Sequence, residues 1–190
     1  MAGFHLTCQG GYYVQVFTFV SGNLALDFAG TVKARTGTAD DGLGAPADLA
    51  DWLVAADLLD RAPDCDAATL AAAVRLREAA YRMAVAKSRG EAPADADRRL
   101  VNTVAKGELP QIALGSDGAI TRSGTPAAAL TAIARSAIEL CGSSASIKEC
   151  GRPACTRLYV DASRGGTRRW CDMTICGNRV KGAAFRARHT

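Results

Sequence analysis

The sequence predicts an α+β protein, with a mainly helical N-terminal domain that has a small strand component and a small cysteine-rich C-terminal module. Two observations lead to this prediction. Apolar residues over the first 142 positions recur at the three- and four-residue spacing of amphipathic helices, in an alanine-rich background. Four of the seven cysteines then fall in two close pairs near the C-terminus. We therefore expect a domain over 1–142 and a module over 147–190, joined by the Gly-Ser-rich stretch 142–146.

Apolar periodicity and turn residues predict the elements of the N-terminal domain. An aromatic and β-branched run at 12–20 predicts a strand. A short amphipathic helix should follow Gly22-Asn23 and end before Thr36-Gly37, because Leu24, Phe28 and Val32 recur at i, i+4 and i+8. Proline at first turns and glycine at ends mark further helices, and a Gly-Ser-Asp-Gly turn marks a β-hairpin. These elements are helices over 46–60, 66–88, 94–106 and 126–141, and a hairpin over 111–121.

Composition excludes several classes of protein. The chain has 190 residues, of which 48% are hydrophobic, so a wholly disordered chain is excluded. No apolar run approaches the roughly 18 residues that a membrane-spanning helix needs. Met1 to Val14 contains no Lys or Arg and no small-residue cleavage site, so it does not resemble a secretory signal. We expect a cytoplasmic protein without a membrane partner.

Charge is distributed unevenly along the chain. From Lys148 onward there are ten Lys or Arg against three Asp or Glu, a net charge of +7. The preceding 147 residues have 13 against 16, a net charge of −3. An acidic body with a basic end is typical of a protein whose basic end meets a polyanion.

The cysteine spacing predicts a metal site. Cys150, Cys155, Cys171 and Cys176 follow the pattern C-x4-C-x15-C-x4-C, and two close thiolate pairs joined by a loop suit tetrahedral zinc. Residues 157–161 and 167–170 should form a hairpin between the pairs, and a short basic helix should follow over 180–188. Knuckle, hairpin and helix in this order are treble-clef-like. Four cysteines saturate the metal, so we expect one structural Zn²⁺ per chain, whereas Cys8, Cys65 and Cys141 are expected to be small buried residues.

Two stretches carry a family resemblance. Residues 168–173 (RRWCDM) followed by Cys176-Gly177-Asn178-Arg179-x-Lys181 resemble the CGNR zinc finger family. Residues 19–28 (FVSGNLALDF) resemble the start of the ABATE domain, which accompanies that finger in bacterial proteins described as stress-induced transcription regulators. The resemblance implies a zinc-binding, DNA-binding regulator with a role in stress response. One departure is Gly30, where the family more often has Asn.

The basic residues of the module are candidates for contacts to nucleic acid. Arg outnumbers Lys among them, which suits bidentate contacts to phosphate or guanine, and a zinc-held scaffold would orient these side chains. The alternatives are a solvated basic face or a surface for an acidic protein partner. The candidates are Arg164, Arg168, Arg169, Arg179, Lys181, Arg186 and Arg188.

Little in the sequence indicates catalysis. The only histidines, His5 and His189, lie near the termini, and no G-x-G-x-x-G or phosphate-binding loop occurs, so we do not expect an enzyme. Asn23, Asp27 and Thr31 would share one face of the first helix, where they could line a pocket for a small-molecule effector. Asp27 is equally compatible with capping a helix or pairing with Arg35.

Function is therefore expected to be that of a zinc-binding, DNA-binding transcription regulator with a ligand-sensing N-terminal domain. The sequence leaves two alternative functions open, a thiol–zinc redox switch and a protein-interaction module, and a second copy of the chain in a homodimer is a candidate partner. We also expect residues 1–142 to fold without the module, whose folding depends on the metal.

Overall fold

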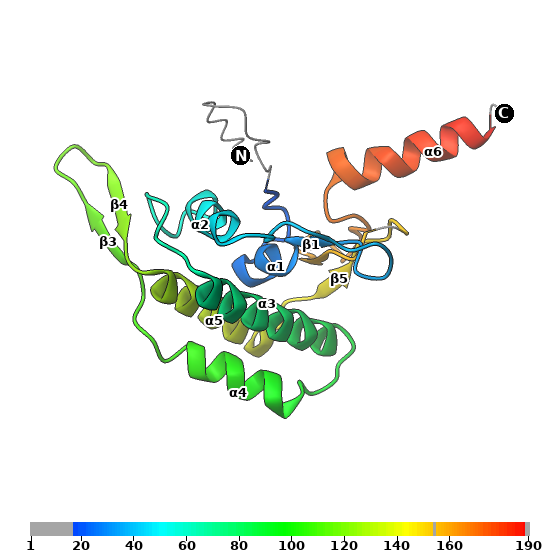
Figure 1. Ribbon diagram of the computed structural model, residues 1–190. Coiled ribbons are helices and arrows are strands. Elements are labelled where there is room, and N and C mark those ends of the chain that lie inside the picture. The colour runs from blue at the N-terminus through cyan, green and yellow to red at the C-terminus, as the bar shows by residue number, and fades with distance from the viewer. Residues whose placement is uncertain (1–16, 154, 189–190) are drawn as a thin grey trace.

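Helices dominate the N-terminal part of the computed structural model, which describes residues 17–153 and 155–188 (Figure 1). The predicted helices and the 111–121 hairpin are present, and they confirm the α+β class. The helices are α1 (Leu24–Ala29), α2 (Pro46–Ala55), α3 (Ala67–Ser88), α4 (Asp95–Val104) and α5 (Pro126–Gly142). Two antiparallel hairpins accompany them, β1 (Val32–Lys33) with β2 (Asp40–Asp41) and β3 (Gln111–Leu114) with β4 (Ile120–Ser123).

The two longest helices begin where the sequence supplies capping side chains. The Asp66 carboxylate accepts a hydrogen bond from the Thr69 N–H at 2.7 Å at the start of α3. The Thr125 hydroxyl accepts one from the Ala128 N–H at 3.1 Å at the start of α5, and Pro126 occupies its first position. These caps fix where α3 and α5 begin, and the two helices pack against each other.

The main core lies between α3, α4 and α5, with α1 and α2 packed over one side. Fully buried alanines, Ala73 and Ala79 on α3 and Ala129 and Ala134 on α5, allow the two long helices to approach closely. Trp52 of α2 covers the core and packs against Phe28 of α1, with ring centroids 4.7 Å apart.

Helix α1 is shorter than predicted. It ends at Ala29, and Val32 belongs to strand β1, paired with Asp41, instead of continuing the helix face. The chain turns at Ala34, which has a positive φ of 51°. Beyond the turn, the Arg35 guanidinium donates to the Ala29 carbonyl and pairs with Glu78 at 2.5 Å. These polar contacts stabilise the turn, which the apolar periodicity alone could not reveal.

The predicted strand over 12–20 is only partly within the described residues. Residues 12–16 lie outside them, and residues 17–20 belong to no strand. The Val20 N–H donates to the Asp27 carboxylate at 3.0 Å, while the carbonyls of Thr18 and Val20 accept from arginines of the C-terminal module. Side chains therefore satisfy this extended backbone in place of a neighbouring strand.

In the C-terminal module the strand partner differs from the prediction. Strand β6 (Leu158–Val160) pairs with β5 (Ile147–Glu149) and not with residues 167–170. Asp161 and Ser163 hold the following loop instead, because the Ser163 hydroxyl accepts from the N–H groups of Thr167 and Arg168. A π-helical turn, η1 (Met173–Gly177), then leads directly into α6 (Asn178–Arg188).

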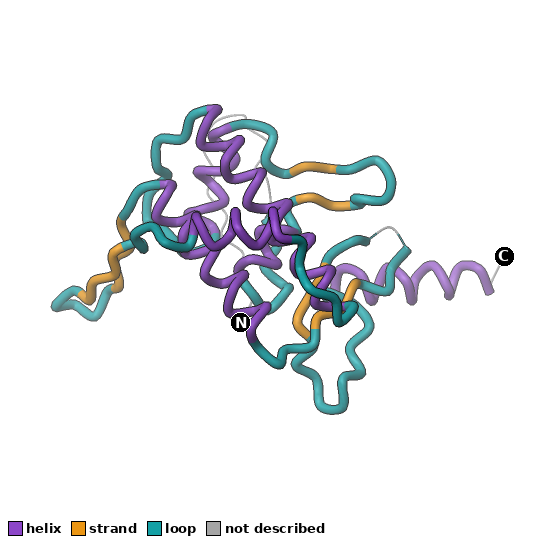
Figure 2. Tube along the Cα trace, turned by 90° about the horizontal axis from the view of Figure 1, so that it is seen from below, coloured by secondary structure: helices purple, strands orange, loops and turns teal. Residues whose placement is uncertain are grey.

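The module packs against the helical domain and shares a small core with it. Leu26 of α1, Ala84 of α3 and Leu140 of α5 cluster with Ile147 and Leu158 of the β5–β6 hairpin. The stretch 143–146 is therefore a short connection between two packed units. Helix α6 and the β3–β4 hairpin project from opposite ends of the molecule, as Figures 1 and 2 both show.

Within the described ranges, no helix has the length and apolar character needed to cross a membrane.

The β3–β4 hairpin leaves the side chains of Ile112, Leu114 and Ile120 exposed to solvent.

We predict that Leu158→Ala destabilises both units, because its side chain is 3% exposed and lies in the shared core. The free energy of unfolding should fall by about 2–4 kcal/mol. The measurement is urea denaturation followed by circular dichroism, with Leu114→Ala as the matched control. Leu114 is 74% exposed, so its loss should change stability by less than about 0.5 kcal/mol. Equal effects of the two variants would contradict the shared core.

Candidate metal centre and basic helix

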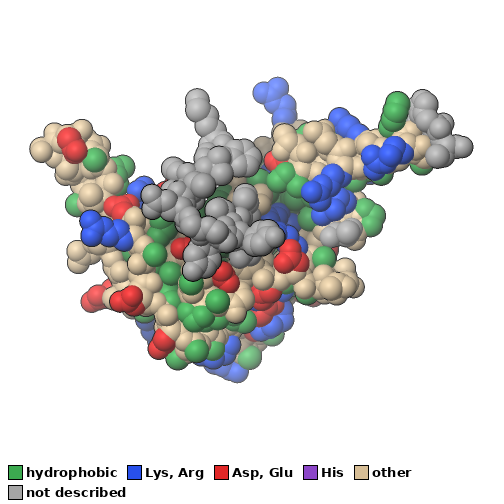
Figure 3. Space-filling model, turned by 45° about the horizontal axis from the view of Figure 1, so that its top comes forward, with side chains coloured by type: hydrophobic (Ala, Val, Ile, Leu, Met, Phe, Trp, Pro, Cys, Tyr) green, Lys and Arg blue, Asp and Glu red, His purple; other side chains and the backbone are tan. Residues whose placement is uncertain are grey.

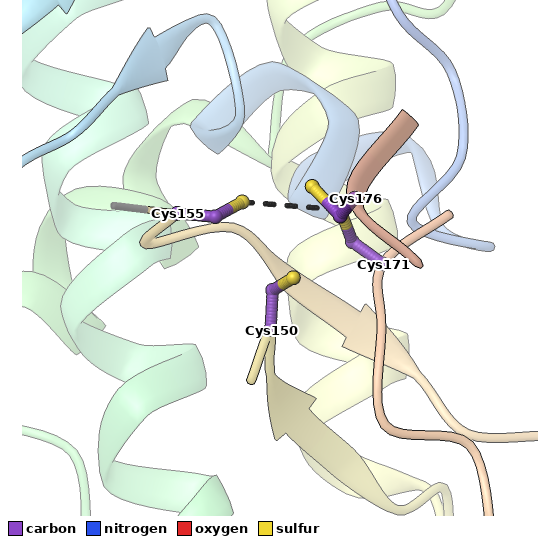
Figure 4. A group of neighbouring side chains, drawn as sticks. All are labelled: Cys150, Cys155, Cys171 and Cys176. Atoms are coloured by element: carbon purple, nitrogen blue, oxygen red, sulfur yellow. Dashed lines mark hydrogen bonds between the residues drawn. The ribbon is translucent and has the colours of Figure 1, made fainter. Parts of the chain in front are cut away.

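The structure brings the four predicted cysteines together. Their sulfur atoms all lie within 4.8 Å of one another, with Cys155 and Cys171 3.9 Å apart and Cys171 and Cys176 3.5 Å apart. Figure 4 shows the four side chains pointing toward a common centre from the β5–β6 hairpin and from the segment that leads into α6. Cys150, Cys171 and Cys176 are buried, and Cys155 is half-buried.

Short-range backbone bonds place each cysteine pair. The Cys155 N–H donates to the Arg152 carbonyl at 2.8 Å, which closes the first knuckle. A Cβ on Gly151 would lie 3.1 Å from the Arg169 carbonyl oxygen, so the neighbouring chain approaches closely only because this residue is glycine. In the second pair, the Asp172 carboxylate accepts from the Ile175 N–H at 2.7 Å and shapes the turn that carries Cys176.

This donor set fits zinc. Tetrahedral zinc with Zn–S bonds near 2.3 Å requires sulfur atoms about 3.8 Å apart. The observed separations need only small adjustments to meet this value. Four thiolates and one Zn²⁺ carry a net charge of −2, and the nearby charge of Cys176 and Cys155 raises the pKa of Arg152, a cation that partly balances this charge. The protein therefore holds one structural zinc ion in this module.

The thiols ionise unequally while they share protons. The interaction between the Cys155 and Cys171 sulfur atoms lowers the pKa of Cys155 to about 4 and raises the pKa of Cys171.

Arg168 does not have the role that the sequence suggested. Its guanidinium donates to the carbonyls of Trp170, Val160, Cys171 and Val20, and it stacks over the Tyr159 ring at 4.4 Å. These contacts occupy the side chain within the protein. Arg168 therefore joins the zinc module to the N-terminal segment, and it is removed from the candidates for nucleic-acid contact.

The other predicted basic residues are divided between a loop and α6. Arg164 and Arg169 are exposed in the loop, with Arg169 5.5 Å from the Trp170 ring. Arg179, Lys181 and Arg186 are exposed on α6, and the side chain of Arg188 lies outside the described part of the structure. Figure 3 shows Lys and Arg side chains along the arm that α6 forms.

The predicted effector pocket is not assembled as expected. Asn23 caps α1, accepting from the Ala25 and Leu26 N–H groups and donating to the Ser136 hydroxyl. Thr31 lies beyond the end of α1, so the three residues do not share a helix face. Asp27 and Thr31 do line one cavity, but its volume of about 10 Å³ holds roughly one water molecule.

Asp27 instead connects the two units. Burial raises the pKa of its carboxyl, and hydrogen bonds from the backbone N–H groups of Ser21 and Val20 and the charge of Arg157 partly oppose this effect. Arg157 lies 3.8 Å from Asp27 and donates to the carbonyls of Thr18 and Gly30. The expected alternative partner, Arg35, pairs with Glu78.

The sequence did not predict two features of the site. Arg157 was not identified, although it lies two residues after a metal ligand in the module's basic sequence. A cavity of about 410 Å³ between the two units was also not foreseen, because its walls come from segments more than a hundred residues apart. The lining residues are Thr18, Val20, Gly30, Val32, Lys33 and Asp40 of the domain and Arg152, Cys155, Thr156, Arg157, Cys171, Ile175, Cys176 and Arg179 of the module.

Comparison with known families agrees with this architecture. The ABATE family, described as "Putative stress-induced transcription regulator", matches residues 22–144, and the CGNR zinc finger matches residues 146–189. No curated protein matches the chain.

We predict about one equivalent of zinc in the purified protein and its loss in Cys171→Ser. A serine hydroxyl is a poor zinc ligand, so the variant should also lose the module's fold. Metal content is measured by inductively coupled plasma mass spectrometry. Cys65→Ser is the control, because Cys65 lies outside the cluster and should leave the zinc content unchanged. Full zinc retention by Cys171→Ser would contradict the ligand assignment.

We also predict that Arg168→Ala destabilises the zinc-loaded protein by about 2 kcal/mol, because a cationic donor to several carbonyls is lost. Arg169→Ala is the adjacent control, exposed and without such hydrogen bonds among the described residues. Urea denaturation at fixed zinc concentration compares the two. If Arg169→Ala were the more damaging change, the structural role of Arg168 would be wrong.

Proposed function

Because the chain belongs to the ABATE family and carries a CGNR zinc finger, we propose that it is a transcription regulator that binds DNA through α6. Zinc binding supports this proposal, since the metal fixes the module from which α6 extends. The proposal is for a regulator and not for an enzyme.

The observation that carries the proposal is the projection of a basic helix from the body. Helix α6 has 11 residues and a length of about 16 Å, and its sequence contains no acidic residue. Arg179 and Arg186 lie seven residues apart and so share one side of the helix, with Lys181 on another. The major groove of DNA admits an α-helix, and flanking cations contact its phosphates.

Sensing of an effector is the second part of the proposal, and we place it in the 410 Å³ cavity between the two units. This volume lies in the range of small-molecule sites, unlike the space beside Asp27 and Thr31. Arg179, in the first turn of α6, lines this cavity. A molecule bound in the cavity would therefore contact the proposed DNA-binding helix directly.

We predict that the Arg179→Ala/Lys181→Ala double variant binds duplex DNA more weakly, with a log–log salt slope lower by about 2, since each phosphate contact contributes about 0.9. Binding is measured by fluorescence anisotropy with labelled duplexes at several salt concentrations. Arg98→Ala/Arg99→Ala is the matched control, because these arginines pair with Asp95 on the surface of α4, away from the module.

The control variant should retain the affinity and the salt slope of the unmodified protein. Two results would contradict the proposal: zinc-loaded protein without measurable affinity for duplex DNA at low salt, or equal losses in the two double variants. A basic surface without DNA affinity would favour a protein or RNA partner.

A further inference from the structure

The cavity between the two units reaches the metal centre. Cys155, Cys171 and Cys176 contribute to its wall, together with Arg152, Arg157 and other residues of both units. Its volume of about 410 Å³ greatly exceeds the roughly 30 Å³ that one water molecule occupies in the liquid. A small polar molecule can therefore reach the zinc ligands from this side.

The four ligands differ in their accessibility. Cys150, Cys171 and Cys176 are 6%, 3% and 2% exposed, whereas Cys155 is half-buried. A molecule in the cavity therefore meets the Cys155 sulfur more readily than the other three. Cys155, Cys171 and Cys176 all border the cavity, and of these three Cys155 is the least buried.

We propose that Cys155 is a modification site for hydroperoxides, of which hydrogen peroxide is the simplest. The Cys155 thiolate attacks one peroxide oxygen and forms an S–O bond, while the O–O bond breaks. The electron pair of that bond leaves with the second oxygen, as hydroxide from hydrogen peroxide or as an alkoxide from an organic hydroperoxide. Cys155 thereby becomes a sulfenic acid.

The arginine beside the thiolates suits this step. The Arg152 guanidinium lies near Cys176 and Cys155, whose negative charge raises the pKa of this arginine, and it lines the cavity. Negative charge moves from sulfur onto the departing oxygen, and a fixed cation at this position stabilises that charge.

A second thiolate is in position to complete the oxidation. The Cys171 sulfur lies 3.9 Å from the Cys155 sulfur, and its attack on the sulfenic acid forms an S–S bond and releases hydroxide. In total, two thiolates lose two electrons to one hydrogen peroxide, which becomes two hydroxides. Two cysteines then remain of the four that a structural zinc site requires, so the ion is released.

The consequence for α6 follows from the connectivity. Cys176 lies in the turn that leads directly into α6, so loss of zinc removes the anchor of this helix. Loss of DNA binding on oxidation rests on the proposed function, whereas the chemistry at Cys155 does not.

The test uses the full zinc-loaded protein without DNA. Hydrogen peroxide is added, zinc release is followed with a colorimetric chelator, and dimedone traps sulfenic acid for peptide mass spectrometry. We expect dimedone on Cys155 first, and a Cys155–Cys171 disulfide when dimedone is omitted. First labelling at Cys150 or Cys176, or full zinc retention in excess peroxide, would overturn the proposal whether or not the protein binds DNA.

Cavity-filling variants test the route of entry. Ile175→Trp narrows the cavity and should slow zinc release several-fold, whereas Met173→Trp, on the same turn but outside the cavity lining, should not. Lys33→Trp repeats the test from the opposite wall, with exposed Lys106→Trp as its control. Metal analysis before peroxide is added confirms that each variant is loaded. Equal rates in both cavity variants and both controls would overturn entry through the cavity.

Discussion

Mutual repulsion of four thiolates within 4.8 Å of one another is the constraint on which the C-terminal module depends, and zinc is the charge that relieves it. Around the cysteines, the module's own buried side chains are few, with Tyr159 and the partly buried Trp170 the largest. Such a core is too small to order roughly forty residues unaided. The ion therefore holds the β5–β6 hairpin and the π-helical turn together, and through that turn it fixes the start of α6.

A second layer of cations attaches the module to the helical domain. Arg157 and Arg168 donate to backbone carbonyls of residues 18–20, and Asp27 accepts from the N–H groups of the same segment. This segment would otherwise expose unpaired backbone groups at the junction. Basic residues of the module thus fall into two groups. Some bind the backbone at the junction with the domain, and others are exposed on the surface of α6.

Sequence patterns within a few residues of one another predicted much of this structure. The predictions that were wrong depended on contacts between residues far apart in the sequence. The cysteine spacing identified the metal ligands because it encodes two tight turns, and Pro126 at the first position marked the start of α5. The predicted strand partner of residues 158–160 was wrong because an apolar pattern does not specify which strands pair. The segment 147–149 occupies the position beside these residues that was predicted for 167–170. Arg168 looked like any other arginine of a basic segment. Its internal role depends on carbonyls brought from residues 20 and 160 by folding.

The cavity lies between the helical domain and the zinc module and borders both the cysteine cluster and the start of α6. Because the module rests on the domain through Arg157 and Arg168, a space remains between Val32 and Lys33 on one side and the cysteine cluster on the other. Arg179 borders this space and also begins the exposed basic face of α6. The least buried zinc ligand, the space that leads to it and the first cation of α6 are therefore neighbours. A chemical change at Cys155 needs no long pathway to reach α6, because the Cys176 turn and Arg179 belong to the same wall.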